Sequence, residues 1–402
     1  MSGSLRIDPS ALDTRAITVA RSRYATYVES TAAESSGFRL TVRAEPTPYA
    51  RCFAVFGFQL LQDHNRLARD ADRWSRAIRA DLDAVCRKRS AAGAHLSADK
   101  PYLQLLTFSL SALAILDRLD EDPLADHVLP VLSTDVEADL RRAGALDGKA
   151  GSGNQAMFLA ILLIHARAML GVDTTSRLER WQSLFLNEMN RFGFWGAASS
   201  ISHLQFQNGY HIYEILEYLD ASVPTWNDTA DYVASLADEE GHFAPYPGGG
   251  GCYDYDAVFM ITGAGAAAVQ RHRDLLLRTA ASILREQNPD GGFCESGCIR
   301  PRSVSTVRRM LRHAGSARGT ALIERSRYGL TLLRPKHDRI QTHWSTYSRE
   351  WGESDLWDSW FRMLTLARSE VALDLARAAD WGFIDYPGIG HHSSLRAVAA
   401  TI

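Results

Sequence analysis

The stretch PYLQLLTFSLSALAILDRL, residues 101–119, decides the fold, because it is apolar around every turn of a helix. A second stretch, NQAMFLAILLIHARAML at 154–170, has the same character, whereas RLARDADRWSRAIRADLDAVCRKR at 66–89 carries charge along one face. A helix that is apolar all round is buried, and a helix with one charged face lies between the core and water. The sequence therefore predicts an all-α fold of buried and solvated helices.

The two kinds of helix alternate along the chain. Apolar segments begin near residues 48, 102, 154, 206, 253 and 355, and amphipathic segments follow near 66, 122, 176, 225, 271 and 369. A glycine followed closely by an aromatic residue also recurs, at Phe194, Phe243, Phe293 and Phe383, and the first three are 49 and 50 residues apart. A period near 50 fits one helical hairpin with a long loop. We expect six hairpins that form an inner barrel and an outer ring, an α/α toroid.

The bulk composition is that of one globular domain. Of the 402 residues 46% are apolar and 23% charged, and no low-complexity linker divides the chain. We expect a single domain over 1–402, with a flanking helix in 1–45 and an enlarged section between repeats at 298–347. That section is rich in arginine, which favours a solvated helix over an anion-binding lid.

Charge and targeting signals exclude several classes of partner. The net charge of −3 gives no general attraction to nucleic acid or anionic membranes. No apolar run is long enough to span a bilayer, and the N-terminus lacks a signal peptide, so we expect a cytoplasmic protein. The five cysteines are too scattered for a disulfide framework, and Cys294 with Cys298 is a weak match to a zinc site. We expect no metal and no cofactor, and the sequence leaves the oligomeric state open.

Three loops carry a resemblance to a known superfamily. LREQNPDGGFCES at 284–296 resembles the Gln-x-x-x-Gly-Gly-Phe/Trp repeat of terpene cyclases and protein prenyltransferases. WGESDLWDSWFRMLTLA at 351–367 is similar to the Gly-Glu-x-Asp start of an inner helix in that superfamily, and GHFAPYPGGGGCYDYDAVFMI at 241–261 has the same layout. The resemblance covers the second half of the chain and implies an α/α toroid. It assigns structural roles to Gln287, Asn288, Gly291, Gly292 and Phe293.

The same resemblance points to an acid. Class II terpene cyclases carry Asp-x-Asp-Asp before an inner helix, and the second Asp protonates an alkene. Asp254 and Asp256 match the first two acidic positions, and Ala257 stands in place of the third. Cys252 and Tyr253 also resemble part of the zinc site of protein prenyltransferases, but Gly250 replaces the ligating Asp. The simpler interpretation of both acids is capping of the helix.

Other polar residues stand at the starts of the predicted inner helices. SHLQFQNGYHIYEILEYL at 202–219 supplies Tyr210 and His211 as candidates for acid–base chemistry, and a packed histidine is the simpler interpretation. We therefore take Asp254, Asp256, His211 and Tyr210 as candidate catalytic residues. The candidate substrate-binding residues are Tyr253, Tyr255, Asn208, Gln155, Glu353, Asp355, Trp357 and His343.

Three functions fit these residues. The first is an enzyme that acts on an isoprenoid or another small apolar substrate, with Asp256 as the proton donor and aromatic rings that stabilise cations. The second is a carbohydrate-active lyase, hydrolase or epimerase that uses an Asp pair or His211 with Tyr210. The third is a helical scaffold without catalysis, in which the same residues only cap and tie helices.

Overall fold

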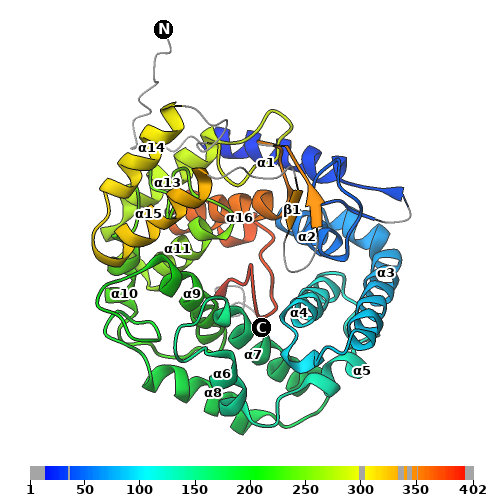
Figure 1. Ribbon diagram of the computed structural model, residues 1–402. Helices are drawn as coiled ribbons and strands as arrows, with labels where there is room; N and C mark the ends of the chain where they lie inside the picture. The colour runs from blue at the N-terminus through cyan, green and yellow to red at the C-terminus, as the bar shows by residue number, and fades with distance from the viewer. Residues whose placement is uncertain are drawn as a thin grey trace.

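The structure is a computed structural model that describes residues 14–34, 37–297, 304–333, 339–341, 346–350 and 352–393 (Figure 1). The longer helices are α1 (Thr14–Ser30), α2 (Pro48–Leu60), α3 (His64–Ala91), α4 (Lys100–Ile115), α7 (Ser152–Met169), α8 (Thr175–Asn187), α9 (His203–Tyr218), α11 (Cys252–Gly263), α13 (Arg273–Arg285), α14 (Val304–Gly315), α15 (Gly319–Leu333) and α16 (Leu356–Ala372). The shorter ones are α5 (Ala125–Val128), α6 (Val136–Ala143), α10 (Trp226–Ala234) and α12 (Ala266–Arg271), with 3₁₀ turns at Leu96–Ala98, Leu129–Val131 and Ala378–Asp380. Two strands, β1 (Arg339–Gln341) and β2 (Thr346–Ser348), form one antiparallel pair. The prediction of an all-α fold is confirmed.

The apolar helices lie side by side in a closed cycle. α2 packs against α4, α4 against α7, α7 against α9, α9 against α11, α11 against α16, and α16 against α2 (Figure 1). The other helices lie around this cycle. α3 covers both α2 and α4. The three helices α5, α6 and α8 cover α7; the two helices α10 and α12 cover α11; and α13 covers α16. The cycle consists of the segments whose sequence is apolar all round, because only those segments have neighbours on every side.

The prediction of an outer helix that begins near residue 369 is wrong. α16 continues through that position to Ala372, and the left-handed Asp374 (φ +59°) then ends the helix. Between Leu373 and His392 the structure has one 3₁₀ turn, Ala378–Asp380, and one isolated bridge between Ile384 and His391. The N-terminal helix α1 instead packs against α2, α13 and α16, and covers the place where the two ends of the cycle meet. A helix from the other end of the chain therefore takes the role assigned to residue 369.

The glycine-aromatic repeat is a recurring turn after the outer helices. In three loops a backbone N–H donates to the carbonyl four residues on, from Asn190, Asp238 and Asn288, at 2.6, 2.8 and 2.9 Å. The fourth residue of each turn is a glycine with positive φ, at +79° in Gly193, +87° in Gly241 and +94° in Gly291. Glycine adopts this conformation without strain.

The superfamily-like loop at 284–296 ties distant segments together. Gln287 donates to the carbonyl of Ala20 in α1 at 2.9 Å, and Asn288 donates to the carbonyl of Gly352 before α16 at 2.8 Å. The backbone N–H of Phe293 donates to Ser359 Oγ at 2.8 Å, and the Phe293 side chain is fully buried. These contacts give the loop the structural role that the resemblance implies.

The segment 381–393 closes the C-terminal ends of the inner helices (Figure 1). The N–H of Gly382 donates to the carbonyl of Leu60 at 3.1 Å, and Tyr386 Oη lies 3.0 Å from Nδ1 of His165 in α7. Arg368 of α16 donates to the carbonyl of the buried His391 at 3.4 Å. His391 is therefore part of a cover rather than an exposed loop.

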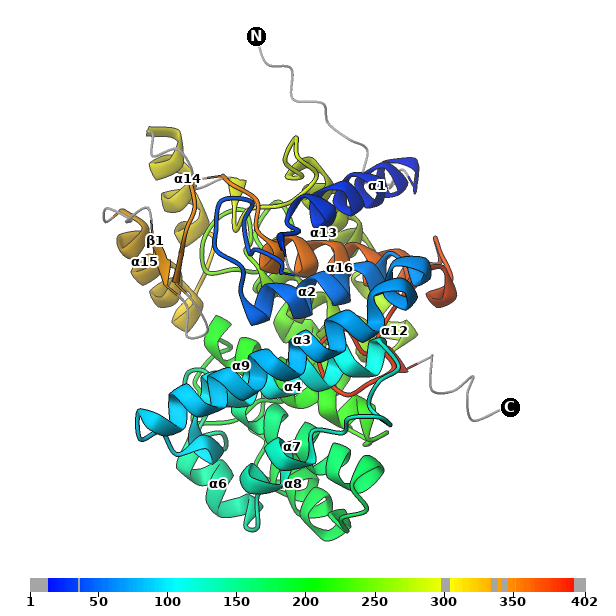
Figure 2. The same ribbon diagram turned by 90° about the vertical axis from the view of Figure 1, so that its right-hand side faces the viewer.

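The enlarged section forms a helical hairpin at one side of the molecule. α14 and α15 pack against each other at the edge of the helical ring (Figure 2). Glu324 of α15 accepts hydrogen bonds from the backbone N–H groups of His203 (2.6 Å) and Leu204 (3.3 Å), at the start of α9. Arg308, Arg312 and Arg318 are exposed, which agrees with the solvated interpretation; Arg300 and Arg302 lie outside the described residues. Within the described part of the chain, no helix is both long and apolar enough to cross a bilayer.

Candidate functional site

The inner helices begin at one rim, which we call the N-terminal rim. Tyr49 in α2 donates to the carbonyl of Pro101 at 2.6 Å, and Lys100 donates to the carbonyl of Gly151 at 3.2 Å. The first turns of α2, α4 and α7 therefore lie beside one another. On the other side, Trp357 of α16 lies against Gly251, the N-cap residue of α11.

The glycine loop before α11 is tightly packed. A Cβ on Gly249 would lie 2.2 Å from Asp254 Oδ2, and a Cβ on Gly250 would lie 1.9 Å from Tyr246 Oη. Successive residues of an α-helix are rotated by about 100°, so two residues that are two positions apart face nearly opposite directions. Asp254 and Asp256 therefore enter different surroundings.

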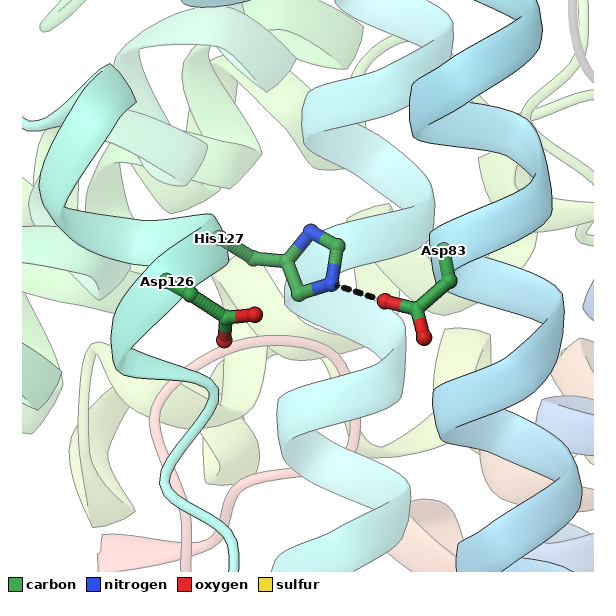
Figure 3. Close-up of side chains that lie close together, drawn as sticks. All are labelled: Asp83, Asp126 and His127. Carbon is green, nitrogen blue, oxygen red and sulfur yellow. Dashed lines mark hydrogen bonds and ion pairs between the residues drawn. The ribbon is translucent and has the colours of Figure 1, made fainter.

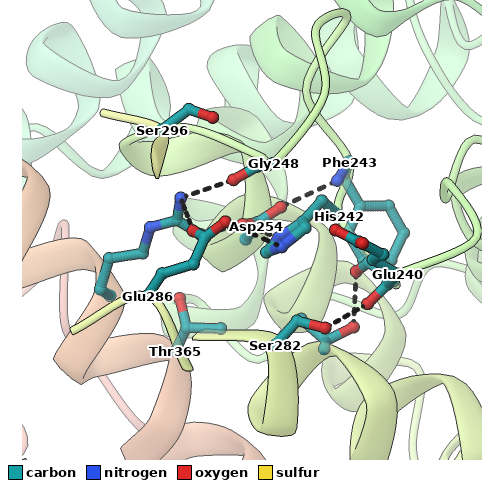
Figure 4. Close-up of polar contacts among 12 residues, drawn as sticks. Glu240, His242, Phe243, Gly248, Asp254, Ser282, Glu286, Ser296 and Thr365 are labelled. Carbon is teal, nitrogen blue, oxygen red and sulfur yellow. Dashed lines mark hydrogen bonds and ion pairs between the residues drawn. The ribbon is translucent and has the colours of Figure 1, made fainter. Parts of the chain in front are cut away.

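Asp254 belongs to a buried ion-pair network (Figure 4). Its Oδ2 accepts from His242 Nδ1 at 3.0 Å and from Arg362, and its Oδ1 accepts from the N–H of Phe243 at 2.8 Å. Arg362 also pairs with Glu286 at 3.2 Å. Burial alone would raise the pKa of Asp254, but His242 and Arg362 outweigh burial and hold the pKa below its ordinary value. Asp254 is thus an ionised residue that ties α11 to α16 and to the loop before α11.

Asp256 has no such partners. It is completely buried, as is Glu214 on the neighbouring helix α9, and within the described residues neither carboxyl makes an ion pair or a hydrogen bond of normal geometry. Burial, reinforced by Glu214, raises the pKa of Asp256 well above its ordinary value. Burial also raises the pKa of Glu214 to about 8. Glu214 is therefore mostly a neutral carboxylic acid at neutral pH, and the direction of the pKa shift favours the protonated form of Asp256 as well.

Tyr210 and His211 lie on the same helix as Glu214 and are also buried. The amide of Asn154 bridges Lys100, whose Nζ lies 3.2 Å from Asn154 Oδ1, and His211, whose Nε2 lies 2.8 Å from Asn154 Nδ2. Burial and Lys100 lower the pKa of His211 to about 3, so the ring is neutral. Because Nε2 accepts from the amide, the proton resides on Nδ1. That N–H has no hydrogen-bonding partner among the described residues, whereas the Tyr210 hydroxyl lies beside the Glu214 carboxyl.

Aromatic rings connect this cluster to the other inner helices. The ring centroids of Tyr210 and Tyr255 are 5.7 Å apart, and those of Tyr255 and Phe361 are 5.9 Å apart. The path continues from Phe361 to Trp357 at 5.0 Å and from Trp357 to Phe53 at 5.1 Å. It ends at Phe108 of α4, 5.5 Å from Phe53. The unpaired acids thus lie at one end of a continuous aromatic layer.

Tyr253 and Trp357 are half-buried at the N-terminal rim. Tyr253 contacts Phe206 and Tyr246, with centroids 6.0 and 6.2 Å apart. Tyr246 in turn contacts Tyr328 of α15 at 5.8 Å, so the hairpin covers part of the rim. Both predicted residues are therefore partly accessible to solvent at this rim.

The remaining predicted residues lie elsewhere. Asn208 accepts hydrogen bonds from the backbone N–H groups of Gly151 (3.0 Å) and Gly153 (3.4 Å), which joins α9 to α7. Asp355 caps α16 through the N–H of Asp358 at 2.8 Å and pairs with Arg349. Glu353 accepts from the N–H of Glu350 at 2.7 Å. Gln155 faces a hollow on the outer flank, and His343 lies outside the described residues.

The structure therefore brings Asp256, Tyr210 and Tyr255 together between α9 and α11. It places His211 beside Asn154 of α7 and separates Asp254 from the cluster. Sequence reasoning missed Glu214, Asn154 and Lys100. Glu214 gives a signal, since it is a carboxylate inside the otherwise apolar run YHIYEIL and lies one helical turn after Tyr210. Asn154 gives none, because its importance comes from two partners that are distant in sequence.

One group of side chains has the geometry of metal ligands. Asp83, Asp126 and His127 place one ligand atom each within 4.8 Å of one another, between α3 and α5 (Figure 3). His127 Nε2 lies 2.7 Å from Asp83 Oδ1, and Arg79 pairs with both Asp83 and Asp126. The guanidinium of Arg79 already supplies positive charge there, so ion pairing accounts for this group. Cys298, which would complete a zinc pair with Cys294, lies outside the described residues.

Comparisons with known proteins do not identify the chain. It matches no known family model, and no curated protein matches it.

Proposed function

We propose that the chain is an α/α toroid enzyme that acts on an apolar, isoprenoid-like substrate, with Asp256 as the proton donor. The closed cycle of inner helices and the layer of outer helices support the toroid. The observation that carries the proposed activity is the pair of buried carboxyls between α9 and α11, Asp256 and Glu214, neither of which has an ion-pair partner among the described residues. Acidic residues are seldom fully buried without such a partner, and exceptions with strongly shifted pKa values are candidates for functional sites.

Each group has a role in this proposal. A general acid must hold its proton at the working pH, and burial keeps the proton on Asp256. Glu214 of α9 is a second neutral carboxyl beside Asp256. In this proposal it takes the place of the third Asp of the Asp-x-Asp-Asp pattern, where this chain has Ala257. A cation formed after protonation meets Tyr255, Phe361 and Trp357, whose π faces stabilise positive charge.

Asp254 is not a proton donor in this proposal. Its carboxylate is ionised and held by Arg362 and His242, so it has no proton to give. We assign it to the positioning of α11. The tyrosine and tryptophan rings of the cluster are mostly buried rather than open at a surface, which favours an apolar substrate over stacking on an oligosaccharide.

Turnover of linear isoprenoids and of their diphosphates by the full-length protein tests the proposal. We expect Asp256→Asn to lower kcat by at least about a hundredfold, as is usual when a general acid is lost. The exposed Asp228→Asn on α10 is the matched control and leaves kcat unchanged. Full activity of Asp256→Asn, or turnover of oligosaccharides but of no isoprenoid, would overturn the proposal.

A further inference from the structure

The hollow that Gln155 faces lies outside the ring of inner helices. It has a volume of about 240 Å³ and lies between α4, α6 and α7. Leu103 of α4, Leu140 of α6 and Leu162 of α7 line it, and each of these leucines is more than nine-tenths buried. The floor of the hollow is therefore aliphatic. An apolar cavity of roughly 150 Å³ is large enough to take up benzene, so this one has room for a larger ligand.

The mouth of the hollow is polar and carries one uncompensated charge. Asp139 and Arg142 form an ion pair with each other across one turn of α6. Lys149 lies beside them, and its ammonium group has no acidic partner within the described residues. The side-chain amide of Gln155, half-buried in the wall, makes no hydrogen bond within the same part of the chain.

We propose that this hollow binds a small amphiphile with an aliphatic body and an anionic head group, such as a medium-chain carboxylate. The aliphatic body removes the faces of Leu103, Leu140 and Leu162 from water, which is favourable in proportion to the apolar area buried. The head group pairs with Lys149 and accepts a hydrogen bond from Gln155, and charge-assisted bonds of this kind are the strong ones. Lys149 disfavours a cationic head group, and a neutral alkane leaves Gln155 without a partner.

This site is independent of the chemistry proposed at Asp256. Asn154 and Gln155 are neighbours on α7, and the helix turns them by about 100°. Asn154 therefore contacts Lys100 and His211 at the N-terminal rim, whereas Gln155 faces the hollow. Ligand binding can be measured whether or not the protein has the proposed activity.

Calorimetric titration of the full-length protein with octanoate tests the proposal, with octanol and octylammonium as neutral and cationic probes. We expect saturable binding of octanoate, and weaker binding of both other probes. Lys149→Gln weakens octanoate binding about tenfold, which corresponds to one charge-assisted hydrogen bond. The exposed Lys88→Gln on α3 is the control and leaves binding unchanged.

Two variants fill the hollow from different sides. Leu159→Trp on α7 and Ala143→Leu on α6 both place extra volume in it, and we expect each to abolish octanoate binding while the melting curve keeps its cooperative shape. The exposed Leu322→Trp on α15 is the control for the added ring. Absence of saturable octanoate binding, or wild-type binding by a folded filled variant, overturns the site. Equal binding of octanoate by wild type and Lys149→Gln overturns the role of the anionic head.

Discussion

Two aspartates on α11 show how the phase of a helix sets the chemistry of a side chain. Asp254 and Asp256 are two residues apart and equally buried. Asp254 faces α16 and the loop before α11, where His242 and Arg362 keep it ionised. Asp256 faces α9, where burial and the neighbouring Glu214 raise its pKa and favour the protonated form. Burial alone therefore does not predict the charge of a carboxyl; its partners do.

The two aspartates differ in what they contribute to stability. A buried charge with good partners, such as Asp254, depends on each partner, and loss of one partner lowers the free energy of unfolding by several kcal/mol. A buried neutral acid without partners gains little from its surroundings and is retained for another reason, which we propose is proton donation.

Glu214→Gln tests the protonated side of the comparison. The folded-state pKa of about 8 exceeds the ordinary value of 4.5, so the folded state retains a proton that the unfolded state loses. This group therefore destabilises the protein as pH rises from about 4.5 to 8, by on the order of 5 kcal/mol in total. We expect Glu214→Gln to remove that loss, which urea unfolding from pH 4 to pH 9 measures. The exposed Glu179→Gln on α8 keeps the slope of the wild type, and an equally steep slope in Glu214→Gln would contradict the prediction.

Asp254→Asn tests the ionised side. The substitution leaves the guanidinium of Arg362 with one carboxylate partner fewer in a buried place, and we expect the free energy of unfolding to fall by about 3–5 kcal/mol at pH 7. Because the pKa of Asp254 is lowered in the folded state, its contribution to stability is present at pH values above the ordinary pKa of 3.8. That contribution is lost as the pH falls through the folded-state pKa. The difference from wild type in urea unfolding should therefore persist at pH 5. Asp228→Asn, exposed in the first turn of α10, should cost less than about 1 kcal/mol.

His242→Gln tests whether the network depends on a charged imidazole. Burial alone would lower the pKa of His242, but Asp254 and Glu286 outweigh burial and raise it above 6.5. Its contribution is therefore fully present below pH 6.5 and is lost as pH rises through the folded pKa. We expect a loss of about 2 kcal/mol at pH 6 that shrinks at higher pH. A loss that does not change with pH would indicate a neutral ring, and the exposed His95→Gln supplies the baseline.

The all-α class could be predicted because it depends on local patterns, such as the fully apolar run at 101–119. The prediction of an outer helix near residue 369 was wrong, because α1, from the other end of the chain, packs against α2, α13 and α16 at that position. The candidate site divides in the same way. Helical spacing alone places Asp256 and Asp254 on different faces, but the partner of Asp254 lies 108 residues away, at Arg362. Such pairs depend on the packing of helices and have no local signal in the sequence.

Asp256→Asn is the smallest expected change in stability and the sharpest contrast with Asp254→Asn. Two effects oppose each other. Because its folded-state pKa is raised, wild-type Asp256 ionises more readily in the unfolded state than in the folded state, which destabilises the fold as pH rises above the ordinary pKa, and the substitution removes that penalty. The amide instead buries N–H donors without partners, at a cost of about 1–3 kcal/mol.

We therefore expect the free energy of unfolding of Asp256→Asn to stay within about 1 kcal/mol of wild type at pH 5 and to rise relative to wild type toward pH 8. Urea unfolding of both Asn variants at the same pH values measures the contrast directly. If Asp256→Asn were as destabilising as Asp254→Asn, Asp256 would be an ionised partner in a second network. It would then hold no proton for catalysis, because the free energy lost on removing a buried carboxylate reports the charge that its partners had stabilised.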